Sequence, residues 1–223
     1  NDLWTSNALI QAAGLPGQNC PDSTLYIVGL PIGNLGDITL RALWILALAD
    51  VVAAEDTRET RKLLDKFGIS VKLLSVREHN ERHGAEQIIE LLQEGKKVTL
   101  VTDAGTPCVS DPGARLVAAV QAAGLRAVPL PGASSITTAL SVAGAVAHST
   151  EHGGFVFAGF LPVKNAERAN VIAQQLAQEP RCVVLLEAPH RIGELAQALA
   201  VLGERGRWLA CQHSAWRYAA ATA

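Results

Sequence analysis

Short apolar runs rich in β-branched residues alternate with amphipathic runs over residues 24–144, and this alternation restricts the fold more than any other feature of the sequence. The strand candidates are 24–29, 50–55, 71–76, 97–102 and 126–130. The segments between them have apolar residues at three-to-four spacing, which is typical of helices that pack on one face. Such alternation predicts right-handed βαβ units and a parallel sheet covered by helices on both faces.

A second α/β block follows a stretch of small residues, 143–154, that is typical of a linker. Its predicted strands and helices lie at 155–160, 165–178, 181–187, 191–203 and 207–211. We therefore expect three parts: an N-terminal extension (1–23), a parallel α/β domain (24–145) and a C-terminal α/β domain (154–223). The last block is short for a domain with a closed core, so we expect it to be incomplete.

Charge, cysteine content and apolar runs exclude several classes of protein. The net charge of −2 argues against a uniformly basic nucleic-acid binder but allows a local basic face. The four cysteines form no C-x-x-C pair, so neither a zinc site nor a disulfide framework is indicated. The N-terminus lacks a basic region followed by an apolar one, and no apolar run reaches the ~20 residues of a membrane span. We expect a cytoplasmic protein with reduced thiols and no membrane partner.

Each predicted strand of the first domain is followed by a polar or glycine-rich loop. These loops are "GLPIGNLGD" (29–37), "EDTRETRK" (55–62), "REHNER" (77–82), "DAGTPCVSDPG" (103–113) and "PGASS" (131–135). Ligands of parallel sheets bind beyond the carboxyl ends of the strands, so the five loops predict a site at one edge. The first loop matches neither the dinucleotide nor the P-loop pattern, and Pro31 lacks an N–H donor. The ligand is therefore not expected to be held by a diphosphate.

Several long motifs resemble a known family. "LYIVGLPIGNLGDITLRAL", "AAEDTRETRKLL", "EHNE", "VTDAGTPCVSDPG", "PGASS", "GFLP" and "EAPHRI" occur in the order and spacing of the ribosomal RNA small subunit methyltransferase I family. That family belongs to the tetrapyrrole-methylase-like enzymes that use S-adenosylmethionine (SAM). The resemblance covers about residues 24–209 and implies two α/β domains with SAM between them. It also implies 2′-O-methylation of a decoding-site cytidine in 16S rRNA, hence the small ribosomal subunit as partner, and it leaves room for a homodimer.

The resemblance also implies a set of cofactor contacts. SAM is a sulfonium zwitterion without a phosphate, so a loop built of proline and backbone carbonyls suits it. The residues placed beside SAM in this way are Leu30, Pro31, Asp103, Gly105, Thr106, Ser134, Ser135, Ile136 and Leu161.

Three residues are candidates for the catalytic base. A ribose 2′-hydroxyl is a weak acid, so a base within hydrogen-bond reach would help methyl transfer, although in-line placement of the two reactants can supply most of the acceleration. Glu55, Asp56 and His79 all follow strands of the first domain, and the sequence does not decide between them. Glu55 or Asp56 also suits the N-cap of the next helix. A metal site from His79 and His83 needs helical spacing there, and we expect none.

A local basic stretch supplies candidate RNA contacts. Residues 58–83 contain seven Lys or Arg against four Asp or Glu, a local excess of three in an otherwise acidic chain. If this stretch lies beside the catalytic edge of the sheet, its cations can bind the phosphate backbone of RNA. Elsewhere on the protein, it would be an ordinary solvent-exposed face. The candidate RNA-binding residues are Asn34, Arg58, Arg61, Lys62 and Asn80. In "EAPHRI", His190 and Arg191 are interpreted as structural, with cleft lining as the alternative.

The chain departs from the family pattern after Leu209, where "ACQHSAWRYAAATA" replaces the expected strand end. Two other functions stay open, and the departure favours the second of them. One is a SAM methyltransferase acting on a tetrapyrrole or another small molecule. The other is a non-catalytic module that binds a nucleotide or RNA.

Overall fold

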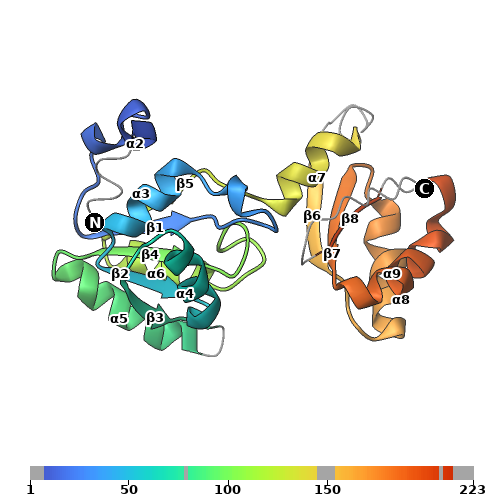
Figure 1. The fold of residues 1–223 in the computed structure, drawn as a ribbon. Helices are drawn as coiled ribbons and strands as arrows, with labels where there is room; N and C mark the ends of the chain where they lie inside the picture. Colours follow the sequence, from blue (N-terminus) through green and yellow to red (C-terminus); the bar gives the residue numbers. More distant parts are fainter. Residues whose placement is uncertain (1–7, 78–79, 145–153, 206–207, 213–223) are drawn as a thin grey trace. The chain divides into compact units, whose positions relative to one another are not determined.

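The computed structural model describes residues 8–77, 80–144, 154–205 and 208–212 (Figure 1). The chain divides into two compact units, one of residues 1–31 and 35–133, the other of residues 32–34 and 134–223. This division falls just before helix α7 (Ser135–Ala143). Most of the linker predicted at 143–154 lies outside the described residues, so the domain boundaries at 145 and 154 stay predictions.

The first unit contains a five-stranded sheet in the order β3-β2-β4-β1-β5. Its strands are β1 (Thr24–Val28), β2 (Val51–Ala54), β3 (Lys72–Ser75), β4 (Lys97–Val101) and β5 (Arg126–Leu130). All four pairings are parallel, and Tyr26 of β1 lies opposite Thr99 on one side and Val128 on the other. The predicted parallel sheet is therefore confirmed, with each strand within one residue of the expected range.

Four helices cover the two faces of this sheet. They are α3 (Leu40–Leu48), α4 (Thr57–Lys66), α5 (Glu81–Gln93) and α6 (Ala114–Ala122). The cluster that contains α3 and α4 includes Val52, whereas the cluster that contains α5 and α6 includes Val51. Successive residues of a strand point to opposite faces, so a strand buried on both sides must be apolar throughout. This requirement explains the continuous apolar run in β2, whose four residues are all buried.

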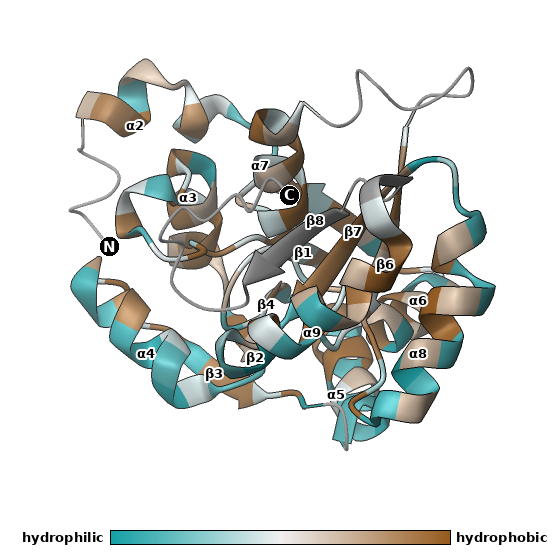
Figure 2. Ribbon diagram, turned by 90° about the vertical axis from the view of Figure 1, so that its right-hand side faces the viewer, coloured by the Kyte–Doolittle hydropathy of each residue, from teal (hydrophilic) through white to brown (hydrophobic). Residues whose placement is uncertain are grey.

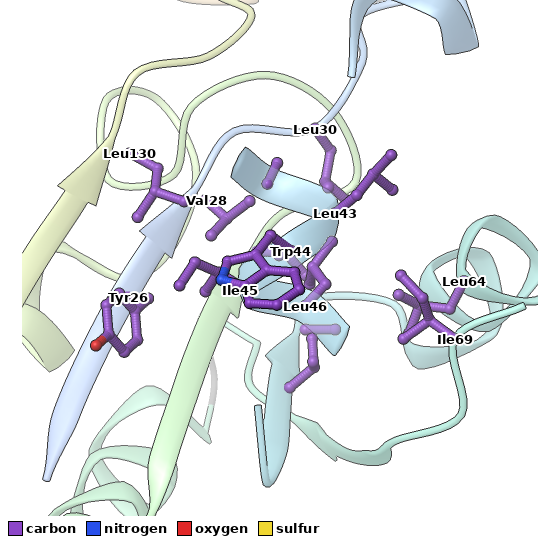
Figure 3. Close-up of a cluster of buried hydrophobic side chains, with 14 of the residues drawn as sticks. Tyr26, Val28, Leu30, Leu43, Trp44, Ile45, Leu46, Leu64, Ile69 and Leu130 are labelled. Atoms are coloured by element: carbon purple, nitrogen blue, oxygen red, sulfur yellow. The ribbon is translucent and has the colours of Figure 1, made fainter. Parts of the chain in front are cut away.

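Trp44 of α3 lies in the middle of one of these clusters, among side chains from β1 and from the α4 region (Figure 3). The N-cap of the helix is Thr39, whose hydroxyl accepts the amide of Ala42 at 3.0 Å and so caps the first turn. The short N-terminal elements α2 (Ala8–Ala12) and η1 (Leu15–Gly17) contribute Ile10 and Leu15 to the same cluster. The described part of the predicted N-terminal extension is thus packed on the first unit.

The second unit contains a three-stranded parallel sheet in the order β6-β7-β8. These strands are β6 (Phe155–Phe160), β7 (Cys182–Glu187) and β8 (Trp208–Gln212). Helices α8 (Asn165–Gln174) and α9 (Ile192–Leu199) pack against Val183 and Leu185 of β7, whereas α7 packs against Val184 and Leu186. β7 is buried along its whole length and is coloured largely as hydrophobic, in contrast to the exposed helix α4 (Figure 2).

Short 3-10 helices complete the described chain: η2 (Leu35–Asp37), η5 (Leu176–Gln178), η6 (Pro189–Arg191) and η7 (Ala200–Arg205), the last interrupted by a kink at Gly203. No helix within the described residues is long and apolar enough to cross a membrane.

Candidate active site at the carboxyl edge of the first sheet

The loops that follow β1, β4 and β5 are joined to one another at the carboxyl edge of the first sheet. The amide of Leu30 donates to the carbonyl of Gly105 at 3.0 Å, and Gly105 donates back to Leu30 at 2.9 Å. Thr106 Oγ1 donates to the carbonyl of Ala133 at 3.0 Å. Three of the predicted cofactor contacts, Leu30, Gly105 and Thr106, therefore lie together in the first unit.

Two glycines allow the β1 and β5 loops to approach closely. A Cβ atom on Gly132 would lie 3.4 Å from the Cα of Gly29, and one on Gly29 would lie 3.4 Å from the carbonyl oxygen of Ala133. Larger side chains would push the two backbones apart. The two glycines therefore serve the close approach of the two backbones.

The β2 loop is fixed to the β4 loop through two aspartates. Asp103 Oδ1 accepts the amide of Asp56 at 3.2 Å. The carboxylate of Asp56 in turn accepts the amide of Arg58 at 2.8 Å, which caps α4. Arg58 also donates to it through Nε at 3.1 Å and Nη2 at 2.7 Å. These contacts with Arg58 hold the pKa of the Asp56 carboxyl well below its usual range.

The β3 loop is held by Asn80. Its Oδ1 accepts the amide of Arg77 at 2.6 Å, and its Nδ2 donates to the carbonyl of Ser75 at 3.3 Å. Arg77 Nε donates to the backbone carbonyl of Glu55 at 3.3 Å, which joins the β3 and β2 loops. The side chain of Asn80 thus closes a turn, a role that the sequence pattern did not indicate. His79 lies outside the described residues.

Glu81, the first residue of α5, was not singled out for a role from the sequence. Its Oε1 accepts backbone amides at the start of α6, and its side chain is buried. The only signal in the sequence is the glycine at position 113, which leaves the start of that helix without a capping side chain.

The three predicted basic contacts on α4 all have partners within the chain. Arg58 pairs with Asp56, and Lys62 Nζ lies 2.7 Å from Glu59 Oε1, yet 79% and 68% of the two basic side chains stay exposed. Arg61 differs, because its Nη2 donates to the carbonyl of Val71 at 2.8 Å and joins α4 to the start of β3. This bond gives Arg61 a structural role, and its contact with RNA stays a prediction.

The remaining predicted residues belong to the second unit or to its boundary. Ser134 is the N-cap of α7, and Ile136 packs against the cluster of Val184 and Leu186. Leu161 is buried among the side chains that α8 and α9 place on β7, so a ligand contact would have to come from its backbone. Pro31 is buried and belongs to the first unit, whereas Asn34 is exposed and is grouped with the second.

"EAPHRI" contains a buried ion pair. Glu187 Oε1 accepts the amide of Ala188 at 2.7 Å and Arg191 Nε at 2.9 Å, while only 3% of the Glu187 side chain is exposed. The pair closes the turn between β7 and α9, which supports the structural interpretation of Arg191. His190 is exposed. Among the residues that the structure describes, no three His, Cys, Asp or Glu side chains are grouped so that they could hold a metal ion.

The parallel sheets and the helices that cover them define an α/β protein. The sequence model described as "Tetrapyrrole (Corrin/Porphyrin) Methylases" matches residues 24–220, and the chain belongs to that family. A solved cobalt precorrin-4 methyltransferase has a similar fold, with a TM-score of 0.50 and 23% identity over 68% of this chain and 64% of that one. The predicted fold class is confirmed.

The curated relatives carry a narrower name. A protein named "Ribosomal RNA small subunit methyltransferase I" from Neisseria meningitidis serogroup B is 50% identical over 84% of this chain. A protein of the same name from Escherichia coli O157:H7 is 46% identical over 81% of the chain. These matches confirm the resemblance found in the motifs. The chain spans 62% of the length of the first relative and 61% of the second.

Proposed function

We propose that this protein is a SAM-dependent methyltransferase that methylates the ribose 2′-oxygen of a decoding-site cytidine in 16S rRNA. The observation that carries the proposal is the identity of 46–50% to proteins named ribosomal RNA small subunit methyltransferase I over 81–84% of the chain. The joined loops at the carboxyl edge of the first sheet support it, because that is where parallel α/β proteins bind ligands. With a ribosomal RNA substrate, the reaction would take place in the cytoplasm and the partner would be the small ribosomal subunit. We further propose that the protein forms a homodimer, which its mass in solution would test.

The chemistry of the edge suits a ligand with positive charge. The loops after β1, β4 and β5 contain no Lys or Arg over 29–40, 102–114 and 131–144. Asp103 is exposed at this edge, so its carboxylate can accept hydrogen bonds or face a cation. Proteins hold a diphosphate with cationic side chains or with several free backbone N–H groups. The amides of Leu30 and Gly105 are not free for this purpose, because each donates to the carbonyl of the other residue. SAM supplies an electrophilic methyl group on a cationic sulfur, and the edge residues fit such a group.

The proposed cofactor residues contribute mainly backbone. Leu30, Pro31 and Gly105 are buried, so we propose that the methyl donor contacts their peptide groups rather than their side chains. Asp103 and the half-buried Thr106 provide the polar side chains. Ser134, Ser135, Ile136 and Leu161 remain proposed cofactor contacts.

The contacts of Asp56 make it less suitable as the catalytic base than the other two candidates. Because Arg58 engages both oxygens of Asp56 and lowers its pKa, that carboxylate is a poor proton acceptor at neutral pH. We propose that Asp56 positions Arg58. Glu55, half-buried directly after β2, and His79 then remain as bases that would take the proton from the ribose hydroxyl. In either case the residues of the edge act chiefly by holding the hydroxyl oxygen in line with the methyl group.

The exposed cations of α4 are proposed to contact RNA phosphates. Arg58 and Lys62 are held on the outer face by their acidic partners, and α4 begins at the same edge as the proposed cofactor site. Replacing Arg58 and Lys62 by alanine should weaken RNA binding and reduce the slope of log K against log salt by about one for each phosphate that is no longer neutralised. Lys164→Ala is a matched control, because that exposed lysine also pairs with a glutamate but lies outside the basic stretch 58–83.

The activity is tested by incubating the protein with methyl-labelled SAM and 30S subunits that lack the modification. Label should appear in 16S rRNA, and mapping should place it on a ribose 2′-oxygen. Naked 16S rRNA and a porphyrinoid substrate serve as comparison arms, the latter because the family description names corrin and porphyrin methylases. Label in the porphyrinoid and none in RNA would replace the proposal with the small-molecule one, and label in neither would reject both.

A further inference from the structure

The start of helix α6 has no capping side chain of its own. Gly113 occupies the N-cap position with φ of 122°, a conformation that side chains disfavour. A Cβ atom there would also lie 2.9 Å from both Cys108 Sγ and Leu100 Cδ2. Position 113 is therefore restricted to glycine, and the first amides of α6 need an acceptor from another part of the chain.

Glu81 supplies that acceptor from a distance of more than thirty residues in sequence. Its Oε1 accepts the amides of Gly113 at 3.0 Å, Arg115 at 3.0 Å and Leu116 at 3.1 Å. The side chain is only 7% exposed, so these bonds are made largely out of water. A carboxylate in this position also interacts favourably with the positive end of the helix dipole.

The loop that ends at this helix is the one that begins with the proposed cofactor residues. At its start, Gly105 is bonded to Leu30 and Asp103 accepts the amide of Asp56. Between the two ends, Cys108 has φ of 69°, which is unusual for a residue with a side chain. The loop is thus fixed at both ends around a strained middle, and the Glu81 carboxylate is the attachment at the far end.

We propose that Glu81 is a positioning residue that holds the loop between β4 and α6 in the shape that binds the methyl donor. This inference rests on the proposed function. Glu81 itself touches neither the methyl donor nor the RNA. It acts through Gly113 on the conformation of the loop, and through the loop on the placement of Asp103, Gly105 and Thr106.

Three variants test the attachment itself by amide hydrogen exchange. Glu81→Ala removes the acceptor, Glu81→Gln keeps a neutral acceptor, and Glu90→Ala removes an exposed acid from the same helix as a control. In Glu81→Ala, exchange at Gly113, Arg115 and Leu116 should rise about tenfold or more, because the three amides no longer have a charged acceptor. The exchange rates in Glu81→Gln should lie between those of Glu81→Ala and those of the wild type. Unchanged exchange in a folded Glu81→Ala variant would overturn the proposal, and if that variant does not fold, unchanged exchange in Glu81→Gln would do so.

SAM titration by calorimetry tests the consequence. The dissociation constant should rise about tenfold in Glu81→Ala, stay within about threefold of the wild type in Glu81→Gln and not change in Glu90→Ala. A merely structural role would lower the melting temperature but leave the affinity of the folded protein unchanged, and that result would overturn the proposal. A wild-type protein that binds no SAM would instead overturn the proposed function, while the exchange experiment would still decide whether Glu81 holds the loop.

Discussion

Replacing Gly113 by alanine should destabilise the first unit more than the same change at the other glycines of its helices. Two costs add at this position. The φ of 122° strains any residue with a Cβ atom, by about 1–3 kcal/mol. The new methyl group would also lie 2.9 Å from Cys108 Sγ and Leu100 Cδ2, an overpacking that costs about 1–3 kcal/mol. The total is about 2–6 kcal/mol, and a loss of ~3 kcal/mol lowers the melting temperature by roughly 6–12 °C.

Two matched variants separate these costs. Gly124 has φ of 75° with no atom within 4 Å of a Cβ, so Gly124→Ala carries only the conformational cost. Gly84 is helical, and its Cβ would lie 2.9 Å from Val76 Cγ2, so Gly84→Ala carries only the packing cost and gains up to ~1 kcal/mol of helix propensity. Thermal unfolding followed by circular dichroism should rank Gly113→Ala as the least stable of the three. If the melting temperature of Gly113→Ala equals that of Gly124→Ala, the packing argument for position 113 is refuted.

Three further predictions concern the charges and thiols of the two units. Glu187→Ala should cost about 3 kcal/mol of unfolding free energy, because it leaves the Arg191 guanidinium without its buried partner; chemical denaturation would measure this, and a loss no larger than that of Glu167→Ala, which removes an exposed partner of Lys164, would contradict it. Asp56 has a pKa lowered by Arg58, so its stabilisation is present above the ordinary pKa of aspartate and is lost as the pH falls below it. Urea midpoints between pH 6 and pH 2 should therefore fall less steeply in Asp56→Asn than in the wild type or in Asp65→Asn, and equal slopes would refute the assignment. Burial raises the pKa of the Cys108 thiol to about 11, so iodoacetamide at pH 8 should modify it only after unfolding, and rapid modification of the folded protein would show that the thiol is accessible and ionised.

The arrangement of the loops could be predicted because it depends on local patterns. Once "TLYIVG" and "KVTLVT" are interpreted as parallel strands, their following loops must reach the same edge, and the contacts between Leu30 and Gly105 are a consequence. The capping role considered for Asp56 is likewise local, since acids favour helix starts.

Other features depend on contacts between residues far apart in the sequence. Nothing near Glu81 indicates that its carboxylate caps a helix that begins more than thirty residues later, or that Arg61 bonds to the backbone of Val71. The RNA contact of Asn80 stays a prediction, and its sequence context did not indicate that both ends of its amide bond to the backbone at the end of β3 and in the loop after it. Polar residues of a loop look alike in sequence whether they face a partner or close a turn, and only the fold separates the two roles.

The central claim is that the loops after β1, β4 and β5 bind a methyl donor that carries positive charge. Calorimetric titration of the protein with SAM and, separately, with ATP tests it most directly, with Asp103→Asn and the exposed control Asp65→Asn alongside. We predict that SAM binds and ATP does not, that Asp103→Asn weakens SAM binding and that Asp65→Asn leaves it unchanged. Binding of ATP without SAM, or equal SAM affinity in all three proteins, would contradict the account.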